Sequence, residues 1–208
     1  MLKKHFHVIL LLVFTAFSLP SIAKGDALYG PVAPAGSAFV RVVNLSTNAV
    51  EAKLENENLH KAAPFTGGKY KFFSPGSKTM TVSGKTFSSQ LMADHYYTLV
   101  ITSTGTAKLV QDFGKPDPSK AVISVYNFSD QPLISLKTAD GKTSVIDNVS
   151  IDGRGDRSIN PVKVKLALVS TTLTPVSEII LERGKVYSLF VTNENDLIVA
   201  SWIKQADE

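Results

Sequence analysis

The strongest constraint on the fold is a two-residue alternation of apolar and polar side chains that recurs along the chain. The alternation occupies six short runs, at residues 39–43, 79–82, 97–101, 122–126, 162–168 and 187–191. Successive side chains of an extended strand point to opposite faces, so each run can bury one face and leave the other for solvent or a second layer. The runs are rich in β-branched and aromatic residues, and no helical period persists over about twelve residues outside the N-terminus. The sequence therefore predicts an all-β protein.

Turn signals separate these runs. Four of them are dipeptides that end in glycine: Pro75-Gly76, Ser83-Gly84, Asp140-Gly141 and Arg183-Gly184. Glycine adopts the backbone conformations that tight turns require, so such pairs are typical of connections between short strands.

The first 23 residues have the pattern of a secretory signal peptide. Lys3 and Lys4 precede an apolar run from Val8 to Leu19, and Ser21-Ile22-Ala23 places small residues where a signal peptidase cuts. The apolar run is too short to span a bilayer. We therefore expect a signal peptide over residues 1–23 and a soluble, exported mature chain.

Charge and cysteine content exclude several classes of protein. Without Lys3 and Lys4, the 22 Lys and Arg residues fall to 20, against 18 Asp and Glu, so the mature net charge is +2. That balance gives no reason to expect nucleic acid as a partner. The absence of cysteine excludes disulfide scaffolds, thiolate metal sites, cysteine nucleophiles and a lipid anchor attached through an N-terminal cysteine.

Two similar halves flank a proline-rich segment. Pro116 and Pro118 remove backbone donors and fix φ, which makes residues 114–119 a poor strand and a good linker. We therefore expect an N-terminal domain over residues 24–113 and a C-terminal domain over residues 120–208.

The halves share two blocks in the same order. Val42–Ser46 (VVNLS) corresponds to Val125–Ser129 (VYNFS) at an offset of 83, from 42 to 125, and Tyr97–Thr102 corresponds to Tyr187–Thr192 at an offset of 90, from 97 to 187. These blocks predict two tandem antiparallel β-sandwich domains produced by internal duplication. The alternative is that an all-β chain reuses similar strand strings by chance.

The second block also predicts a structural role for its tyrosines. Leu91 precedes Tyr97 by six residues, and Leu181 precedes Tyr187 by the same spacing with a glycine between them. A tyrosine that begins a strand in a Greek-key sandwich can pack its ring in the core and bond its hydroxyl to upstream backbone, forming a tyrosine corner. We expect both tyrosines to be structural.

The chain offers no convincing set of catalytic or metal-binding residues. After the signal peptide the histidines are His60 and His95, neither of which has metal-ligand spacing. A serine nucleophile needs a base within hydrogen-bond reach, and no histidine follows His95. Ser158 lies near Asp156 and is the best remaining candidate nucleophile. The sequence predicts no catalytic site, no metal and no cofactor.

Two segments carry residues that a core does not explain. Gly153–Pro161 contains Arg154 and Arg157, which we place in a flexible, glycine-rich loop. Guanidinium groups recognise carboxylates, so a uronate polymer or an acidic partner surface is open as the target, and a charged turn with local salt bridges is the structural alternative.

The second segment is Lys69-Tyr70-Lys71-Phe72-Phe73. Aromatic rings beside lysines can stack on sugars and neutralise carboxylates, which makes Lys69, Tyr70 and Lys71 candidate polysaccharide-binding residues. The alternative is an amphipathic strand that buries Tyr70 and Phe72 and exposes the lysines.

Four stretches of the chain resemble the AlgF family of periplasmic alginate O-acetylation proteins. They are Ala27–Ser37 leading into Phe39–Asn44, Leu136–Lys142, Gly153–Arg157 with Ile159–Val164, and Leu181–Gly184. The resemblance extends from residue 27 to about residue 192 and is weakest over residues 51–71.

The resemblance implies a place and a process. Family members act in the periplasm and are needed for O-acetylation of mannuronate residues in alginate, an exopolysaccharide of biofilms. They work with a membrane-bound O-acetyltransferase and with periplasmic SGNH-type acetyltransferases. Since no triad is expected, the resemblance implies a non-catalytic adaptor that links these partners.

For an adaptor, we expect Arg154, Arg157 and Tyr29 to face a partner. A carbohydrate-binding module that presents alginate is the alternative, and an acetyl carrier or transferase that uses Ser158 is a third.

Overall fold

The computed structural model describes residues 32–114, 117–171, 173–194 and 197–204. The predicted signal peptide and Tyr29 lie outside these residues. Residues Ala33–Glu208 form one compact unit. Within the described part of this unit, every regular element is a strand, so the predicted all-β class is confirmed. None of the described residues belongs to a helix long and apolar enough to cross a membrane.

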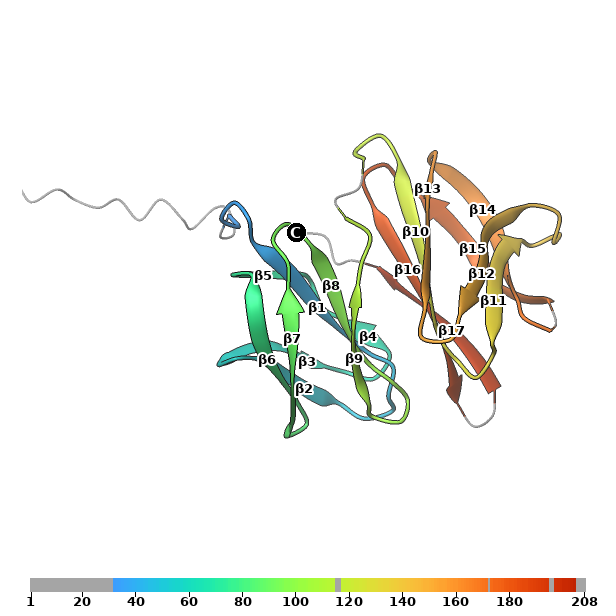
Figure 1. Cartoon of the computed structure of the whole chain (residues 1–208). Helices are drawn as coiled ribbons and strands as arrows, with labels where there is room; N and C mark the ends of the chain where they lie inside the picture. The colour runs from blue at the N-terminus through green and yellow to red at the C-terminus, as the bar shows by residue number, and fades with distance from the viewer. Residues whose placement is uncertain (1–31, 115–116, 172, 195–196, 205–208) are drawn as a thin grey trace, which may run out of the picture. The chain divides into compact units, whose positions relative to one another are not determined.

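The strands fall into two successive sets (Figure 1). The first set is β1 (Ala38–Asn44), β2 (Val50–Leu54), β3 (Glu57–Ala62), β4 (Thr66–Gly67), β5 (Lys71–Phe73), β6 (Gly76–Val82), β7 (Lys85–Leu91), β8 (Tyr96–Ile101) and β9 (Ala107–Gln111). The second set is β10 (Ala121–Phe128), β11 (Leu133–Thr138), β12 (Ser144–Ser150), β13 (Arg154–Ile159), β14 (Val162–Val169), β15 (Leu173–Leu181), β16 (Val186–Glu194) and β17 (Leu197–Lys204). All six predicted runs lie in strands. The predicted linker lies between β9 and β10, and its boundaries stay a prediction.

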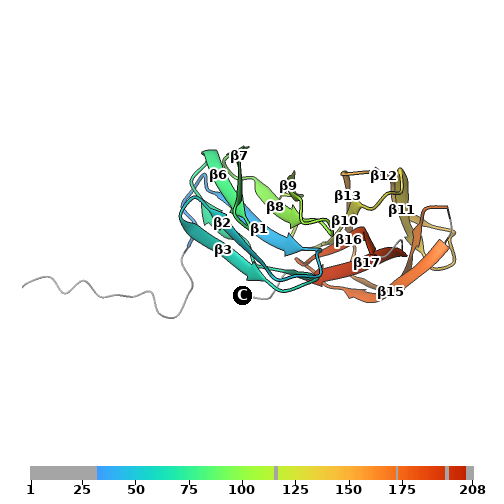
Figure 2. The ribbon, with the colours of Figure 1, turned by 90° about the horizontal axis from the view of Figure 1, so that it is seen from below.

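Each set forms a sandwich of two sheets, and both sandwiches have the same topology (Figures 1 and 2). In the N-terminal sandwich one sheet has the order β4-β1-β8-β9, with β5 also paired to β1, and the other has the order β3-β2-β6-β7. In the C-terminal sandwich the orders are β13-β10-β16-β17 and β12-β11-β14-β15. Because β10, β16 and β17 take the places of β1, β8 and β9, the topology agrees with the predicted tandem duplication.

One strand pair in each sandwich is parallel, which the prediction of antiparallel sandwiches did not include. Strand β1 runs parallel to β8, and β10 runs parallel to β16, while the other pairs are antiparallel. Parallel neighbours need a long crossover, and the intervening strands of the same sandwich supply it in each half. The alternation of apolar and polar residues within a strand does not indicate whether its neighbouring strand runs parallel or antiparallel to it.

Each sandwich has its own apolar core. Side chains of β1, β2, β6 and β8 form the N-terminal core, and side chains of β10, β11, β14 and β16 form the C-terminal core. A third cluster joins the sandwiches and contains Val43, Leu45, Val100, Tyr126, Phe190 and Ile203. Strands β1, β8, β10 and β16 are therefore buried on both faces.

The predicted tyrosine corners are present in both sandwiches. The Tyr97 hydroxyl accepts a hydrogen bond from the Met92 backbone amide at 3.0 Å, and the Tyr187 hydroxyl accepts one from the Glu182 amide at 3.0 Å. Both tyrosine rings are buried in their own core. These contacts confirm the structural interpretation of the two tyrosines.

The Asn-x-Ser sequence that occurs in both halves forms equivalent hydrogen bonds in the two sandwiches. The buried Asn44 side chain donates to the Ala62 carbonyl at 3.1 Å and accepts from the Ser46 hydroxyl at 2.8 Å. Asn127 makes the corresponding bonds to the Val149 carbonyl and the Ser129 hydroxyl, at 3.1 and 2.6 Å. In both repeats the asparagine satisfies buried backbone groups where the chain leaves the sheet.

The prediction of a flexible loop at Gly153–Pro161 is wrong. Residues Arg154–Ile159 form strand β13, which pairs with β10 over its full length. Gly155 suits this strand because a Cβ atom there would lie 2.5 Å from Cγ2 of Ile146. The glycine thus allows close packing under a strand, and it does not mark a loop.

Candidate functional site

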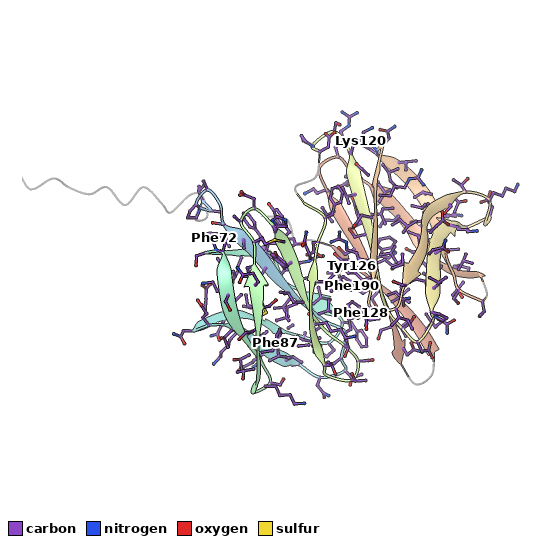
Figure 3. The ribbon with its side chains drawn as sticks, viewed as in Figure 1. Phe72, Phe87, Lys120, Tyr126, Phe128 and Phe190 are labelled. Carbon is purple, nitrogen blue, oxygen red and sulfur yellow. The ribbon has the colours of Figure 1, made fainter. Side chains whose placement is uncertain are left out.

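The two sandwiches meet through equivalent faces of their duplicated sheets. Alternate residues of β1 and β8 that point away from the N-terminal core meet alternate residues of β10 and β16. Tyr126 and Phe190 stack with ring centroids 4.3 Å apart, and Figure 3 shows both rings on the side of the C-terminal sandwich that faces the other sandwich. This contact buries a group of polar side chains at its centre.

Arg41 of β1 is the largest of these polar side chains and is only 1% exposed. Its Nε donates to the Thr98 hydroxyl at 2.8 Å, and its Nη2 donates to the Ser188 hydroxyl at 2.9 Å. The guanidinium carbon lies 4.9 Å from the centroid of the Tyr70 ring, a cation–π distance. The remaining nitrogen, Nη1, is buried without a hydrogen-bond partner among the described residues.

Asp112 follows β9 and is 6% exposed. Its Oδ2 accepts from the hydroxyls of Tyr70 at 2.7 Å and Thr98 at 2.5 Å, and its Oδ1 accepts from the Tyr126 hydroxyl at 2.5 Å. The Tyr126 hydroxyl also accepts a long bond of 3.5 Å from Arg41 Nη2. Two hydroxyls therefore connect the buried cation to the buried carboxylate.

We call this group the Arg41–Asp112 cluster. Its members are Arg41, Tyr70, Thr98, Asp112, Tyr126 and Ser188. The first four belong to the N-terminal sandwich and the last two to the C-terminal sandwich. The cluster thus joins the repeats through bonds to charged groups, which are stronger than bonds between neutral groups.

Burial and the neighbouring charges set the protonation of the cluster. Burial raises the pKa of Tyr70 and of Tyr126 well above the usual tyrosine value, and the Asp112 carboxylate raises both further. Burial alone would lower the pKa of Arg41, but its interactions with Tyr70, Tyr126 and Asp112 outweigh burial and raise it. Both phenols therefore stay neutral and Arg41 stays charged.

A second set of contacts joins the sandwiches beside the cluster. Arg154 of β13 donates to the Gln111 carbonyl of β9 and pairs with Asp156 at 2.7 Å. Lys108 of β9 pairs with Asp152, in the turn before β13. These contacts lie along the edge strand of each sheet.

A cavity of about 140 Å³ opens at the junction. It is lined by Tyr70, Tyr96, Asp112, Phe113, Gly114, Ser124, Tyr126, Gly184 and Val186. Its volume is close to that of an engineered cavity of about 150 Å³ that admits benzene. By volume, the cavity could therefore hold one six-membered ring or a few water molecules.

The lining of the cavity does not form a nucleophile and base. The Ser124 hydroxyl donates to Asp156 at 2.6 Å, but that carboxylate is paired with Arg154 and does not line the cavity. His95 lies outside the lining, and its Nδ1 is 2.7 Å from the Ala93 carbonyl oxygen. Among the described residues, no group of three or more acidic, histidine or cysteine side chains could hold a metal ion.

The predicted partner-facing arginines both make contacts within the chain. Arg154 is half-buried and contacts Gln111 and Asp156. Arg157 is exposed, and its Nη1 donates to the carbonyls of Ser144 and Val145 at 2.8 and 3.1 Å. Arg157 therefore remains accessible, whereas Arg154 is part of the junction. A role in partner binding stays a prediction for both arginines and for Tyr29, which lies outside the described residues.

The predicted polysaccharide-binding residues also separate. Tyr70 belongs to the buried cluster, while Lys69 and Lys71 are exposed, with Lys71 Nζ 2.7 Å from the Asn58 carbonyl. The alternative, an amphipathic strand that buries Tyr70 and Phe72, predicted the wrong core residues. Phe73 joins the N-terminal core, and Phe72 does not. Binding of a polysaccharide through Lys69, Tyr70 or Lys71 stays a prediction.

Sequence reasoning missed Arg41 and Asp112. One signal could have revealed Arg41: it is a charged residue within a β-branched run, and it occupies the position of Ser124 in the second repeat, at the same offset of 83. No comparable signal marks Asp112, since a carboxylate just after a strand is ordinary.

A family model described as "Alginate O-acetyl transferase AlgF" matches residues 10–188 of this chain. The chain belongs to the AlgF family. The alginate biosynthesis protein AlgF of Pseudomonas fluorescens is 42% identical over 190 residues, which cover 90% of this chain and 87% of that protein. AlgF of Pseudomonas aeruginosa is 40% identical over 185 residues, covering 88% and 85%.

Two solved structures match one half of the chain each. The C-terminal domain of P. aeruginosa AlgF is 41% identical, covers 41% of this chain and 98% of that domain, and has a TM-score of 0.38. The N-terminal domain of the same protein is 34% identical, covers 39% of this chain and all of that domain, and has a TM-score of 0.35. By its family match the chain is an alginate biosynthesis protein of an O-acetylation family, and its described strands form two successive all-β sandwiches.

Proposed function

We propose that this AlgF is a non-catalytic periplasmic adaptor required for O-acetylation of mannuronate residues in alginate. In this role it links the membrane-bound O-acetyltransferase to the SGNH-type acetyltransferases of the periplasm. The family match supports the process, and the predicted signal peptide supports the compartment.

One observation supports the adaptor role. Among the described residues, the buried charged groups Arg41 and Asp112 are used to join the two sandwiches. Arg41 and Asp112 bind each other through Thr98 and Tyr126 and leave no free base beside a nucleophile. A transferase needs an activated nucleophile and donors aimed at the developing oxyanion. An adaptor needs a firm scaffold that presents its surfaces to other proteins.

The description of the matching family contains the word transferase, so activity must be tested directly. The purified mature chain should transfer no acetyl group from an activated ester to mannuronate oligomers, with or without Ser158→Ala. A purified SGNH-type acetyltransferase serves as the positive control. Turnover by the chain alone that Ser158→Ala abolishes would refute the adaptor role.

Partner binding is tested in cells that make alginate. Crosslinking followed by mass spectrometry should recover the membrane-bound O-acetyltransferase and a periplasmic acetyltransferase on this chain. Arg157→Glu is the sharper surface variant, because Arg154→Glu would also remove the contact with Gln111. Loss of capture and acetylation in Arg157→Glu, with the melting temperature unchanged, would support this surface, and unchanged capture would exclude it.

A further inference from the structure

Four of the residues that line the junction cavity can give a ligand only hydrogen-bond acceptors. Tyr70 and Tyr126 both donate their hydroxyl hydrogens to Asp112, and a hydroxyl that has donated its hydrogen has only lone pairs left. Ser124 donates its hydroxyl hydrogen to Asp156. The Asp112 carboxylate has no hydrogen to donate, and its Oδ1 accepts one bond among the described residues, which leaves room for a second. This side of the cavity therefore suits a ligand that donates hydrogen bonds.

The charge of the lining is negative. Asp112 is the one charged side chain among the described residues that line the cavity. Arg41 and Arg154 bind residues beside the cavity, but neither guanidinium group is part of the lining. Like charges repel at short range, so the lining disfavours a carboxylate ligand such as acetate or a uronate. The cavity therefore suits a cation better than an anion.

Aromatic rings supply much of the remaining wall of the cavity. The four rings are those of Tyr70, Tyr96, Phe113 and Tyr126. The Tyr96 ring makes a T-shaped contact with Tyr70 at a centroid distance of 5.2 Å and stacks on Phe39 at 4.5 Å, so two neighbours hold it in place. The face of an aromatic ring attracts cations. Rings and a carboxylate in one cavity favour a positively charged donor over a neutral one.

The rest of the lining suits a slender side chain with an apolar stem. Phe113 and Val186 add apolar surface, and Phe113 is exposed to solvent. Gly114 and Gly184 add no side chain, and a Cβ atom at Gly114 would meet no atom within 4 Å. Lysine and arginine carry a cationic group at the end of a hydrocarbon stem that packs on apolar surface. Such a side chain can therefore enter beside Gly114 and place its charge near Asp112.

We propose that the cavity binds the guanidinium or ammonium group of an arginine or lysine side chain that another protein presents. The group donates hydrogen bonds to Asp112 and Ser124, and its stem packs along Phe113. The class of ligand rests on the lining residues alone. Only the source of the cation, another protein, rests on the proposed adaptor role.

Capped amino acids test the class of ligand on the mature chain. Acetylated arginine amide and acetylated lysine amide should shift the NMR amide signals of Phe113, Gly114 and Gly184 in a saturable way. The matching derivatives of citrulline and norleucine have similar shapes without the charge, and they should bind at least about tenfold more weakly. Acetate should not shift these signals. Equal binding of charged and neutral derivatives, or no binding of either cation, would overturn the proposal.

Two aromatic variants test the place of binding. Tyr96→Leu removes a ring that lines the cavity, whereas Phe72→Leu removes a half-buried ring that does not line it (Figure 3). Tyr96→Leu should raise the dissociation constant of the arginine derivative at least about fivefold, and Phe72→Leu should leave it unchanged. Tyr96→Phe keeps the ring and should still bind. The NMR spectrum of each variant shows whether it is folded, and equal effects of Tyr96→Leu and Phe72→Leu would overturn the proposal.

The source of the cation is tested with butylamine, which is the lysine side chain without its backbone. Butylamine should bind no more tightly than the capped lysine if the cavity receives a side chain of a protein. Tighter binding of butylamine would assign the cavity to a free amine and overturn the proposal. These outcomes leave the adaptor role itself unaffected, because crosslinking in cells tests that role separately.

Discussion

Removal of the Asp112 charge should test the Arg41–Asp112 cluster most severely. Asp112→Asn keeps the size of the side chain but leaves Arg41 buried without a compensating charge. The carboxylate accepts three hydroxyl bonds at 2.5 to 2.7 Å, and an amide nitrogen cannot accept those made to the atom it replaces. Leaving a buried charge without its compensating charge costs about 3–5 kcal/mol.

The matched partner variant is Arg41→Met, which leaves Asp112 buried without its cation. We expect a similar loss, because Arg41 makes bonds to Thr98 and Ser188 and is almost fully buried. The double variant should lose less than the sum of the two, with a coupling energy of about 1–3 kcal/mol, because it removes both charges together. Urea unfolding of all four proteins gives the cycle.

The size of the effect makes it easy to observe. For a chain of this length, about 1 kcal/mol corresponds to roughly 2–4 °C in melting temperature, so Asp112→Asn should melt about 6–20 °C lower. Single losses below about 1 kcal/mol, or losses that add in the double variant, would refute the view that the cluster joins the sandwiches.

Three further predictions concern single features. Tyr187→Phe should lose about 1–3 kcal/mol of unfolding free energy, because it leaves a buried amide without its acceptor, and an unchanged urea midpoint would contradict the tyrosine corner. Gly155→Ala should cost about 1–3 kcal/mol through overpacking, whereas Gly114→Ala, which has no atom within 4 Å of its Cβ position, should cost almost nothing in the same assay. Burial raises the pKa of Tyr70 and of Tyr126, so these phenols lose their protons at a lower pH in the unfolded chain than in the folded chain. The free energy of unfolding should therefore be unaffected by these phenols below pH 10 and should fall above it by up to about 1.4 kcal/mol per pH unit for each phenol. Tyr126→Phe should make this alkaline loss shallower, and equal stability at pH 8 and pH 11 would contradict the burial of both phenols.

Local patterns predicted six of the seventeen described strands and both tyrosine corners. Alternation and β-branched residues place the strands because a half-buried strand needs them, and the spacing from Leu181 to Tyr187 sets the corner. The repeat of Asn44 at Asn127 revealed the duplication. These features depend on neighbours close in sequence, which a single sequence can report.

Features that depend on distant contacts were missed. The parallel pairing of β1 with β8 joins residues about sixty positions apart, and no local pattern encodes its direction. The glycines before Arg157 indicated a loop, but the segment pairs with β10 as a strand, and Gly155 leaves room for Ile146 to pack against it. The burial of Arg41 and Asp112 depends on how the two folded sandwiches contact each other. The alternation of apolar and polar residues within a strand does not encode that contact.

The duplication explains why buried opposite charges, connected through hydroxyls, are useful at this junction. Two faces from a repeated unit are similar, so each could also pair with its own counterpart in another molecule. An apolar junction would often be as stable as a buried ion pair, but it would discriminate less between these pairings. Arg41 corresponds to Ser124, and Tyr126 corresponds to Val43, so only the N-terminal face contacting the C-terminal face supplies both the charges and the hydroxyl that connects them. If two N-terminal faces packed together, Asp112 would lack the Tyr126 donor. If two C-terminal faces packed together, the Tyr126 hydroxyl would be buried without Asp112 as its acceptor. The cluster therefore favours the pairing of the two sandwiches of one chain over the pairing of like faces from different chains.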